Sequence, residues 1–101
     1  LTMVKLVVLY KKPADVSAFE THYKEIHTPL VRKMPGLKKL EVCHFTGSPG
    51  GEPKFYMMAE LYFDTKEAMM SALGSPEGKA AAKDVMSFAG DLIHMMFADV
   101  A

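Results

Sequence analysis

Four runs of apolar residues with the two-residue period of a β-strand are separated by stretches with the spacing of a helix. We expect strands at residues 3–11, 37–46, 54–63 and 91–100 and helices at 15–25, 65–73 and 76–89, with one or two more helical turns over 30–34. The order is βαββαβ with the second helix in two parts. It predicts a ferredoxin-like α+β fold, in which helices cover one face of a four-stranded antiparallel sheet.

Capping residues and a proline set the expected limits of the first helix. Either Asp15 or Ser17 can cap it, because Ser17 opens a capping-box pattern and Asp is an equally good cap residue. Pro29 disfavours helical geometry at Thr28, so we expect this helix to run only to about Glu25.

The predicted strands are apolar on both faces of the sheet. The face that should meet the helices is wholly apolar: Val4, Leu6, Val8, Tyr10, Phe55, Met57, Ala59, Leu61, Phe63, Ile93, Met95 and Phe97. The other face mixes apolar residues with a few polar ones: Lys5, Val7, Leu9, Tyr56, Met58, Glu60, Tyr62, Leu92, His94, Met96 and Ala98. Because a face so rich in Met and Tyr is poorly suited to water, we expect two subunits to pack their sheets together about a two-fold axis and close a barrel.

The second strand leaves two side chains unassigned. Leu40 and Val42 share a face with His44, and Cys43 lies on the other. If Leu40 and Val42 meet the helices, Cys43 faces the barrel and His44 does not, unless a bulge reverses one of them.

The most informative feature of the chain is a stripe of rings at four-residue spacing, formed by Phe19, Tyr23 and His27. Residues four apart lie on one face of a helix, so the two aromatic rings lead to an imidazole. His27 could act as a general acid or base on a phenol or enol proton, with its ring steered by Tyr23 or a carboxylate. The alternative is a histidine at a helix end that bonds to a nearby carbonyl. His22 points away from the stripe, and we expect it at the surface.

The mixed face of the sheet supplies the other catalytic candidates, Glu60 and His94. A carboxylate buried beside aromatic rings often has a raised pKa, which suits proton transfer, but Glu60 could instead form an ion pair with Lys5. His94 could equally be a neutral histidine that is hydrogen-bonded across a dimer.

Six residues are candidates for ligand binding: Lys5, Tyr23, Tyr56, Met58, Tyr62 and Met96. For Tyr56 and Tyr62, packing in an interface is the stronger alternative, and for the methionines it is ordinary core packing. Cys43 would be a nucleophile only beside a base, so we expect it to be a small core residue.

Composition excludes several function classes. The chain has 101 residues without a composition break, so we expect one domain over residues 1–101. Lys plus Arg equals Asp plus Glu, 12 each, which argues against nucleic acid or an anionic membrane as a partner. A single cysteine and the lack of a signal-peptide pattern or a membrane-spanning apolar run favour the cytoplasm. No metal-ligand spacing and no glycine-rich nucleotide fingerprint is present, so we expect no metal and no other cofactor.

Two motifs, F-x-x-x-Y-x-x-x-H-x-P-L over residues 19–30 and M-P-G-L over residues 34–37, together with the closing strand, resemble the EthD family. The family is named for its link to the degradation of ethyl tert-butyl ether and belongs to the dimeric α/β-barrel superfamily. The resemblance implies a homodimer with a pocket between each sheet and the ends of its helices. Relatives include cofactor-free oxygenases, cyclases, decarboxylases and lactone isomerases. The haem-degrading members depend on a tryptophan that this chain lacks, although haem ligation by His27 or His94 stays open.

Together these features predict a homodimer that binds a small apolar or aromatic molecule in a barrel-side pocket. The expected chemistry is proton transfer or oxygen chemistry by a cofactor-independent oxidoreductase, isomerase or cyclase, with His27 as acid/base and Glu60, His94 and Tyr23 in support. The alternatives are a non-catalytic ligand-binding or accessory protein of a degradation pathway, and a dimer whose interior is packed solid.

Overall fold

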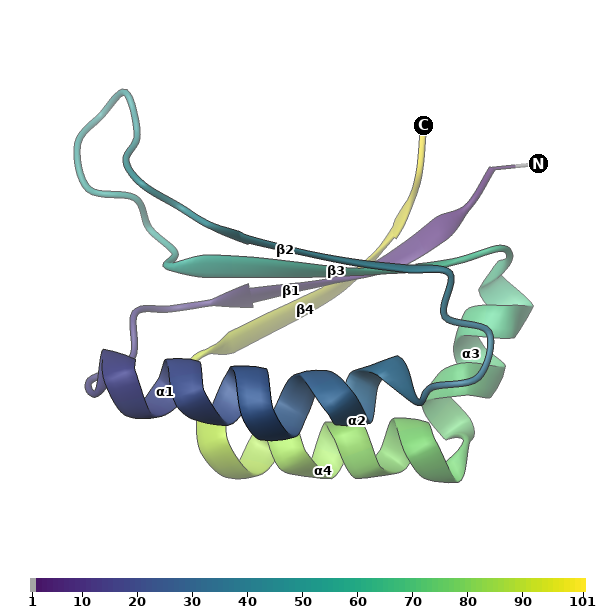
Figure 1. Cartoon of the computed structure of the whole chain (residues 1–101). Coiled ribbons are helices and arrows are strands. Elements are labelled where there is room, and N and C mark those ends of the chain that lie inside the picture. Colours follow the sequence, from purple (N-terminus) through teal and green to yellow (C-terminus); the bar gives the residue numbers. More distant parts are fainter. Residues whose placement is uncertain (1) are drawn as a thin grey trace.

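The computed structural model describes residues 2–101, and Leu1, the first residue of the expected domain, lies outside them. A twisted antiparallel sheet lies on a layer of helices, as Figure 1 shows. In chain order the elements are β1 (Val4–Tyr10), α1 (Val16–His22), the π-helical turn η1 (Tyr23–His27), α2 (Thr28–Arg32), β2 (Lys39–His44), β3 (Met57–Phe63), α3 (Lys66–Gly74), α4 (Pro76–Ala89) and β4 (Ile93–Asp99). The strands are ordered β2-β3-β1-β4, which confirms the predicted ferredoxin-like α+β fold.

Three side chains cap the helices. Asp15 Oδ1 accepts a hydrogen bond from the Ala18 N–H at the start of α1, which decides between the two expected caps in favour of Asp15. The hydroxyls of Thr65 and Ser75 do the same for α3 and α4.

The first helix does not end near Glu25, so that prediction is wrong. α1, η1 and α2 run on without a break, and Thr28 keeps helical angles of φ −57° and ψ −44°. The Thr28 N–H bonds to the carbonyl of Tyr23, five residues back instead of four. In a regular α-helix the ring of Pro29 would clash with the carbonyl four residues earlier. The wider π turn, which ends two residues before Pro29, accommodates the proline and lets the helix continue.

The helix side of the sheet forms the core. All the helix-facing residues of β1 and β3 are buried, as the alternation predicted: Val4, Leu6, Val8, Tyr10, Met57, Ala59, Leu61 and Phe63. β4 lies at the edge of the sheet, where Met95 and Phe97 face the helix side but stay about half exposed. We call the opposite side, which Figure 1 shows without helices, the bare face.

The expected alternation fails just ahead of two strands. Tyr56 packs edge-on against Phe19 on the helix side at 6.1 Å between ring centroids, and Phe55 packs against His94 on the bare face at 5.5 Å. Leu92 packs against the core. These three residues precede β3 and β4, and a connecting backbone does not keep the two-residue period of the ladder. Their predicted facings are therefore wrong.

The register of β2 settles the facing of His44 and Cys43. Leu40, Val42 and His44 pair with Leu61, Ala59 and Met57, so they lie on the helix side. Cys43 pairs with Met58 and lies on the bare face, where it is exposed. The pairing runs through β2 without a bulge, but Cys43 is not the core residue that we expected.

We predict that Gly78→Ala destabilises the fold at the junction of α3 and α4. A Cβ on Gly78 would lie 2.1 Å from the carbonyl oxygen of Ala72 and 2.7 Å from that of Leu73. Relieving such an overlap requires a backbone shift, which typically costs about 1–3 kcal/mol of unfolding free energy. Gly74→Ala is the matched control, because its Cβ meets no atom within 4 Å. Equal midpoints of urea unfolding for the two variants would contradict this account of the junction.

Candidate functional site

A cavity of about 270 Å³ lies between the helix layer and the sheet. Its walls are mainly apolar and come from β1, β3, α4 and the continuous helix of α1, η1 and α2, which we call the first helical segment and which contributes residues of η1 and α2. Met86, Met95 and Phe97 line its side at the edge of the sheet, where each is about half exposed. The volume is near the lower limit for small-molecule pockets, so the cavity suits a compact, largely apolar ligand.

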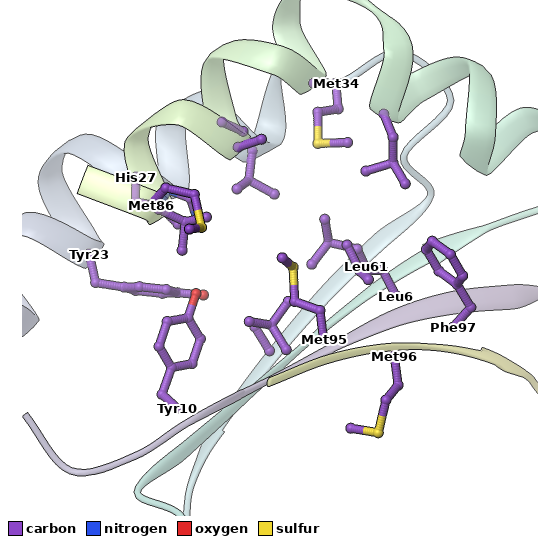
Figure 2. A pocket seen from close by; sticks show the side chains of 18 residues that line it. Leu6, Tyr10, Tyr23, His27, Met34, Leu61, Met86, Met95, Met96 and Phe97 are labelled. Carbon is purple, nitrogen blue, oxygen red and sulfur yellow. The ribbon is translucent and has the colours of Figure 1, made fainter. Parts of the chain in front are cut away.

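The side chains of Tyr10, Tyr23 and His27 bring polar atoms to the cavity. The tyrosine rings meet edge-on at 5.7 Å between centroids, and Figure 2 shows their hydroxyl groups next to each other. Burial raises the pKa of Tyr23 to about 12 and also raises that of Tyr10. Both hydroxyls therefore stay protonated at neutral pH and can donate a hydrogen bond to a ligand oxygen.

His27 ends the aromatic stripe, as the sequence predicted. Its ring lies 5.4 Å from that of Tyr23, which in turn stacks on Phe19 at 5.9 Å, and all three side chains are buried. The partner of His27 is a carboxylate that the sequence analysis did not consider: its Nδ1 lies 3.0 Å from Oδ2 of Asp84 on α4. Since this contact occupies Nδ1, Nε2 is the nitrogen that remains for a molecule in the cavity.

His22 binds the same carboxylate. Its Nε2 lies 2.9 Å from Oδ1 of Asp84 and 3.2 Å from Oδ2, so His22, which is partly exposed as expected, has a partner that the sequence did not reveal. The two histidines are five residues apart and would diverge on a regular α-helix. The π turn, whose hydrogen bonds span five residues, brings both rings to Asp84. The signal in the sequence was a pair of histidines five residues apart, the second of which lies two residues before a proline.

The charge state of His27 follows from its surroundings. Burial lowers the pKa of His27, and this outweighs the hydrogen bond and the charge of Asp84, both of which raise it. The neutral imidazole is therefore the main form at pH 7 and can accept a proton. Because the unfolded chain takes up this proton at higher pH than the folded one, His27 supports stability above pH 6.5, and that support is lost as the pH falls through the folded pKa.

The other two catalytic candidates, Glu60 and His94, do not share the cavity with His27. Both lie on the bare face, on the other side of the sheet. Glu60 forms an ion pair with Lys5 at 2.6 Å, which was the expected alternative to a catalytic role. His94 packs on Phe55. The prediction of one site around His27, Glu60 and His94 is therefore wrong in its geometry, because alternate residues of a strand face opposite sides.

The ligand-binding candidates divide in the same way. Tyr23 lies in the cavity, whereas Lys5, Met58 and Tyr62 lie on the bare face, where Tyr62 donates a hydrogen bond to Glu41 at 3.0 Å. Met96 is among the residues that border the cavity, but its side chain points away in Figure 2.

Tyr56 lies neither in the cavity nor on the bare face. It donates a hydrogen bond to Glu20, and this bond, with burial, raises the pKa of Tyr56 to about 12. Glu20 also holds His44 at 3.0 Å. Tyr56 therefore joins α1 to the sheet beyond the cavity.

Within residues 2–101, no three His, Cys, Asp or Glu side chains are arranged to hold a metal ion. Over the same residues, no helix is both long and apolar enough to cross a membrane.

Comparison with known proteins agrees with the fold and the sequence motifs. The family model described as "EthD domain" matches residues 11–91. A 38% identical relative, an uncharacterised 11.0 kDa protein from the thcB–thcC intergenic region of Rhodococcus erythropolis, aligns over 96% of this chain and 94% of its own length. The crystal structure of an EthD family protein from Bacillus halodurans C-125 is 47% identical, with a TM-score of 0.95 over 98% of this chain and 99% of the other. The chain belongs to the EthD family.

More distant structures share the fold alone. A dimeric ferredoxin-like protein from Thermobifida fusca has a TM-score of 0.72 at 12% identity, over 98% of this chain and 92% of its own. SnoaB, a cofactor-independent oxygenase from Streptomyces nogalater, has a TM-score of 0.67 at 13% identity, over 100% of this chain and 93% of its own.

We predict that Asp84→Asn lowers the pKa of His27 further. The carboxylate stabilises the protonated imidazole by its charge and its hydrogen bond; an amide has no charge, and its oxygen is a weaker acceptor. NMR titration of the His27 ring in both proteins measures the shift. Asp91→Asn, which removes a charge in the segment after α4, should leave the titration of His27 unchanged. An unchanged or raised pKa in Asp84→Asn would contradict the assigned pairing.

Proposed function

We propose that this protein binds a small, largely apolar organic molecule in the cavity and moves a proton on it, with His27 as the acid/base. The observation that carries the proposal is the Asp84–His27 pair at the wall of an apolar cavity. Asp84 accepts the Nδ1 proton of His27, so the tautomer with a free lone pair on Nε2 is favoured. A buried neutral imidazole oriented by a carboxylate is a competent general base.

Tyr10 and Tyr23 supply the second part of the proposed chemistry. When a base removes a proton from a phenol, or from a carbon beside a carbonyl, negative charge develops on the oxygen of the substrate. Two protonated hydroxyls next to each other in a mainly apolar cavity can donate hydrogen bonds to that oxygen. The proposed substrates are therefore compact phenols, enols or carbonyl compounds, whose anions can then isomerise, cyclise or react with oxygen. The fold shared with a cofactor-independent oxygenase is consistent with this class of chemistry.

A ligand-binding or accessory protein without catalysis is the second candidate. The mainly apolar lining favours it, because such a wall retains an apolar molecule by burial alone. Binding without turnover distinguishes this function from the first.

We also propose that two copies pack their bare faces together. The apolar surface of this face comes from Val7, Leu9, Met58 and Met96, and none of the helices within residues 2–101 covers it. Such a surface is typical of a two-fold interface. Lys5, Glu60, Tyr62 and His94 would then line the space between the two sheets, as polar contacts or as a second site separate from His27.

We predict that His27→Gln removes turnover but keeps binding. Glutamine has a similar size and can still donate to Asp84, but it cannot accept a proton. Against a panel of phenols, quinols and lactones, kcat should fall by roughly 10²–10⁴-fold, the usual contribution of a general acid/base, while ligand affinity changes little.

His44→Gln is the matched control, because His44 bonds to Glu20 outside the cavity lining. Full turnover in His27→Gln would refute the assigned role. A wild-type protein that retains a compound, as detected by mass spectrometry, but converts no member of the panel would favour the binding protein instead.

We predict that Met96→Glu weakens the dimer. Met96 lies on the bare face and is 48% exposed in the subunit, so the substitution would place two carboxylates within an apolar interface. Sedimentation at micromolar concentration should show a dimer for the wild type and mostly monomer for Met96→Glu. Met70→Glu, at a 39% exposed position on α3, should sediment like the wild type. A monomeric wild type would exclude the proposed interface.

A further inference from the structure

We propose that His22, Asp84 and His27 form a proton relay, through which His27 exchanges its proton with water while a ligand fills the cavity. The relay deepens the function proposed above and rests on the role of His27 as the acid/base. It assigns a role to His22, which does not line the cavity.

The first support is the geometry around one oxygen atom. Oδ2 of Asp84 lies 3.0 Å from Nδ1 of His27 and 3.2 Å from Nε2 of His22. A proton that reaches Oδ2 from one imidazole is already within hydrogen-bond distance of the other, so the carboxyl group need not rotate.

The second support is the gradient of exposure along the three side chains. The exposed fraction is 7% for His27, 14% for Asp84 and 33% for His22. His22 also lines a second hollow of about 510 Å³ between the start of α1 and the end of α4. The chain of contacts therefore leads from a buried base to a group that water reaches.

Acidic side chains and an aromatic ring surround His22. Asp15 and Asp91 line the second hollow with it, and Asp15 and Glu25 line an open hollow on its other side. Phe88 packs against both imidazoles, with ring centroids 4.3 Å from His22 and 5.3 Å from His27. Phe88 therefore holds the two rings in place beside Asp84.

Each transfer in the relay breaks one bond to hydrogen and forms one. After His27 has accepted a substrate proton on Nε2, the N–H bond at its Nδ1 breaks and an O–H bond forms at Oδ2 of Asp84. His22, which donates to Asp84 from Nε2 at rest, first changes tautomer through water by losing the Nε2 proton and gaining one on Nδ1; the O–H bond at Oδ2 then breaks as Nε2 takes the proton. His22 releases its Nδ1 proton to water, and the reverse sequence reprotonates His27. No electron is transferred, and the net result is the movement of one proton between the cavity and water.

Exchange of the His27 Nδ1 proton with water tests the relay in the unliganded wild-type protein. NMR saturation transfer on protein with ¹⁵N-labelled histidine measures this rate. His22→Gln keeps a donor to Asp84 but cannot carry a proton, so we expect the exchange to slow by at least about tenfold, as for the loss of an acid/base group. An equal rate in His22→Gln would show that His22 has only a structural role and would overturn the relay.

A rescue experiment covers the case in which His22→Gln is poorly folded. In His22→Ala, added free imidazole should fill the vacated position and accelerate the exchange at His27, whereas pyrazole, a far weaker base, should not. No acceleration by imidazole, or equal acceleration in the wild type, would overturn the relay. These readouts do not depend on turnover: if His27→Gln abolishes catalysis but His22→Gln leaves the exchange unchanged, the proposed function stands and the relay fails.

Discussion

The candidate site depends on one carboxylate, that of Asp84, which holds two histidines of the first helical segment against α4. A carboxylate removed from water needs partners that donate hydrogen bonds, and the two imidazoles supply them. In return, Asp84 orients His27 at the wall of the cavity. The contact of Asp84 with the two histidines therefore serves both the packing of the helical layer and the proposed chemistry. A change at Asp84 should affect both the packing of the helices and the protonation of His27.

The π turn and Pro29 form a single structural feature. The turn makes room for the proline ring, and the same five-residue hydrogen bonding brings His22 and His27 to one side of the helix. A regular α-helix would place only one of them at Asp84. π turns often occur at functional sites because they change the direction of side chains without ending the helix.

The sequence predicted the fold and the arrangement of the aromatic stripe because periodicity within an element is a local property. The alternation along β1 and β3 and the spacing of Phe19, Tyr23 and His27 are both found in the structure. The site was predicted only in part, since Asp84 is 57 residues from His27 and no local pattern links them. The prediction that Glu60 supports His27 in one site was wrong for a related reason. The sequence showed a sheet that is largely apolar on both faces, but it did not show which face held the cavity.

The protonation of His27 at pH 7 tests the account most directly. The ¹⁵N chemical shifts of its two ring nitrogens distinguish the two neutral tautomers and the imidazolium ion. If Asp84 accepts a proton from His27 and burial keeps the ring neutral, Nδ1 carries the proton and Nε2 has a free lone pair. A proton on Nε2 at this pH, in the other tautomer or in the charged form, would leave the cavity without a base and would contradict the account.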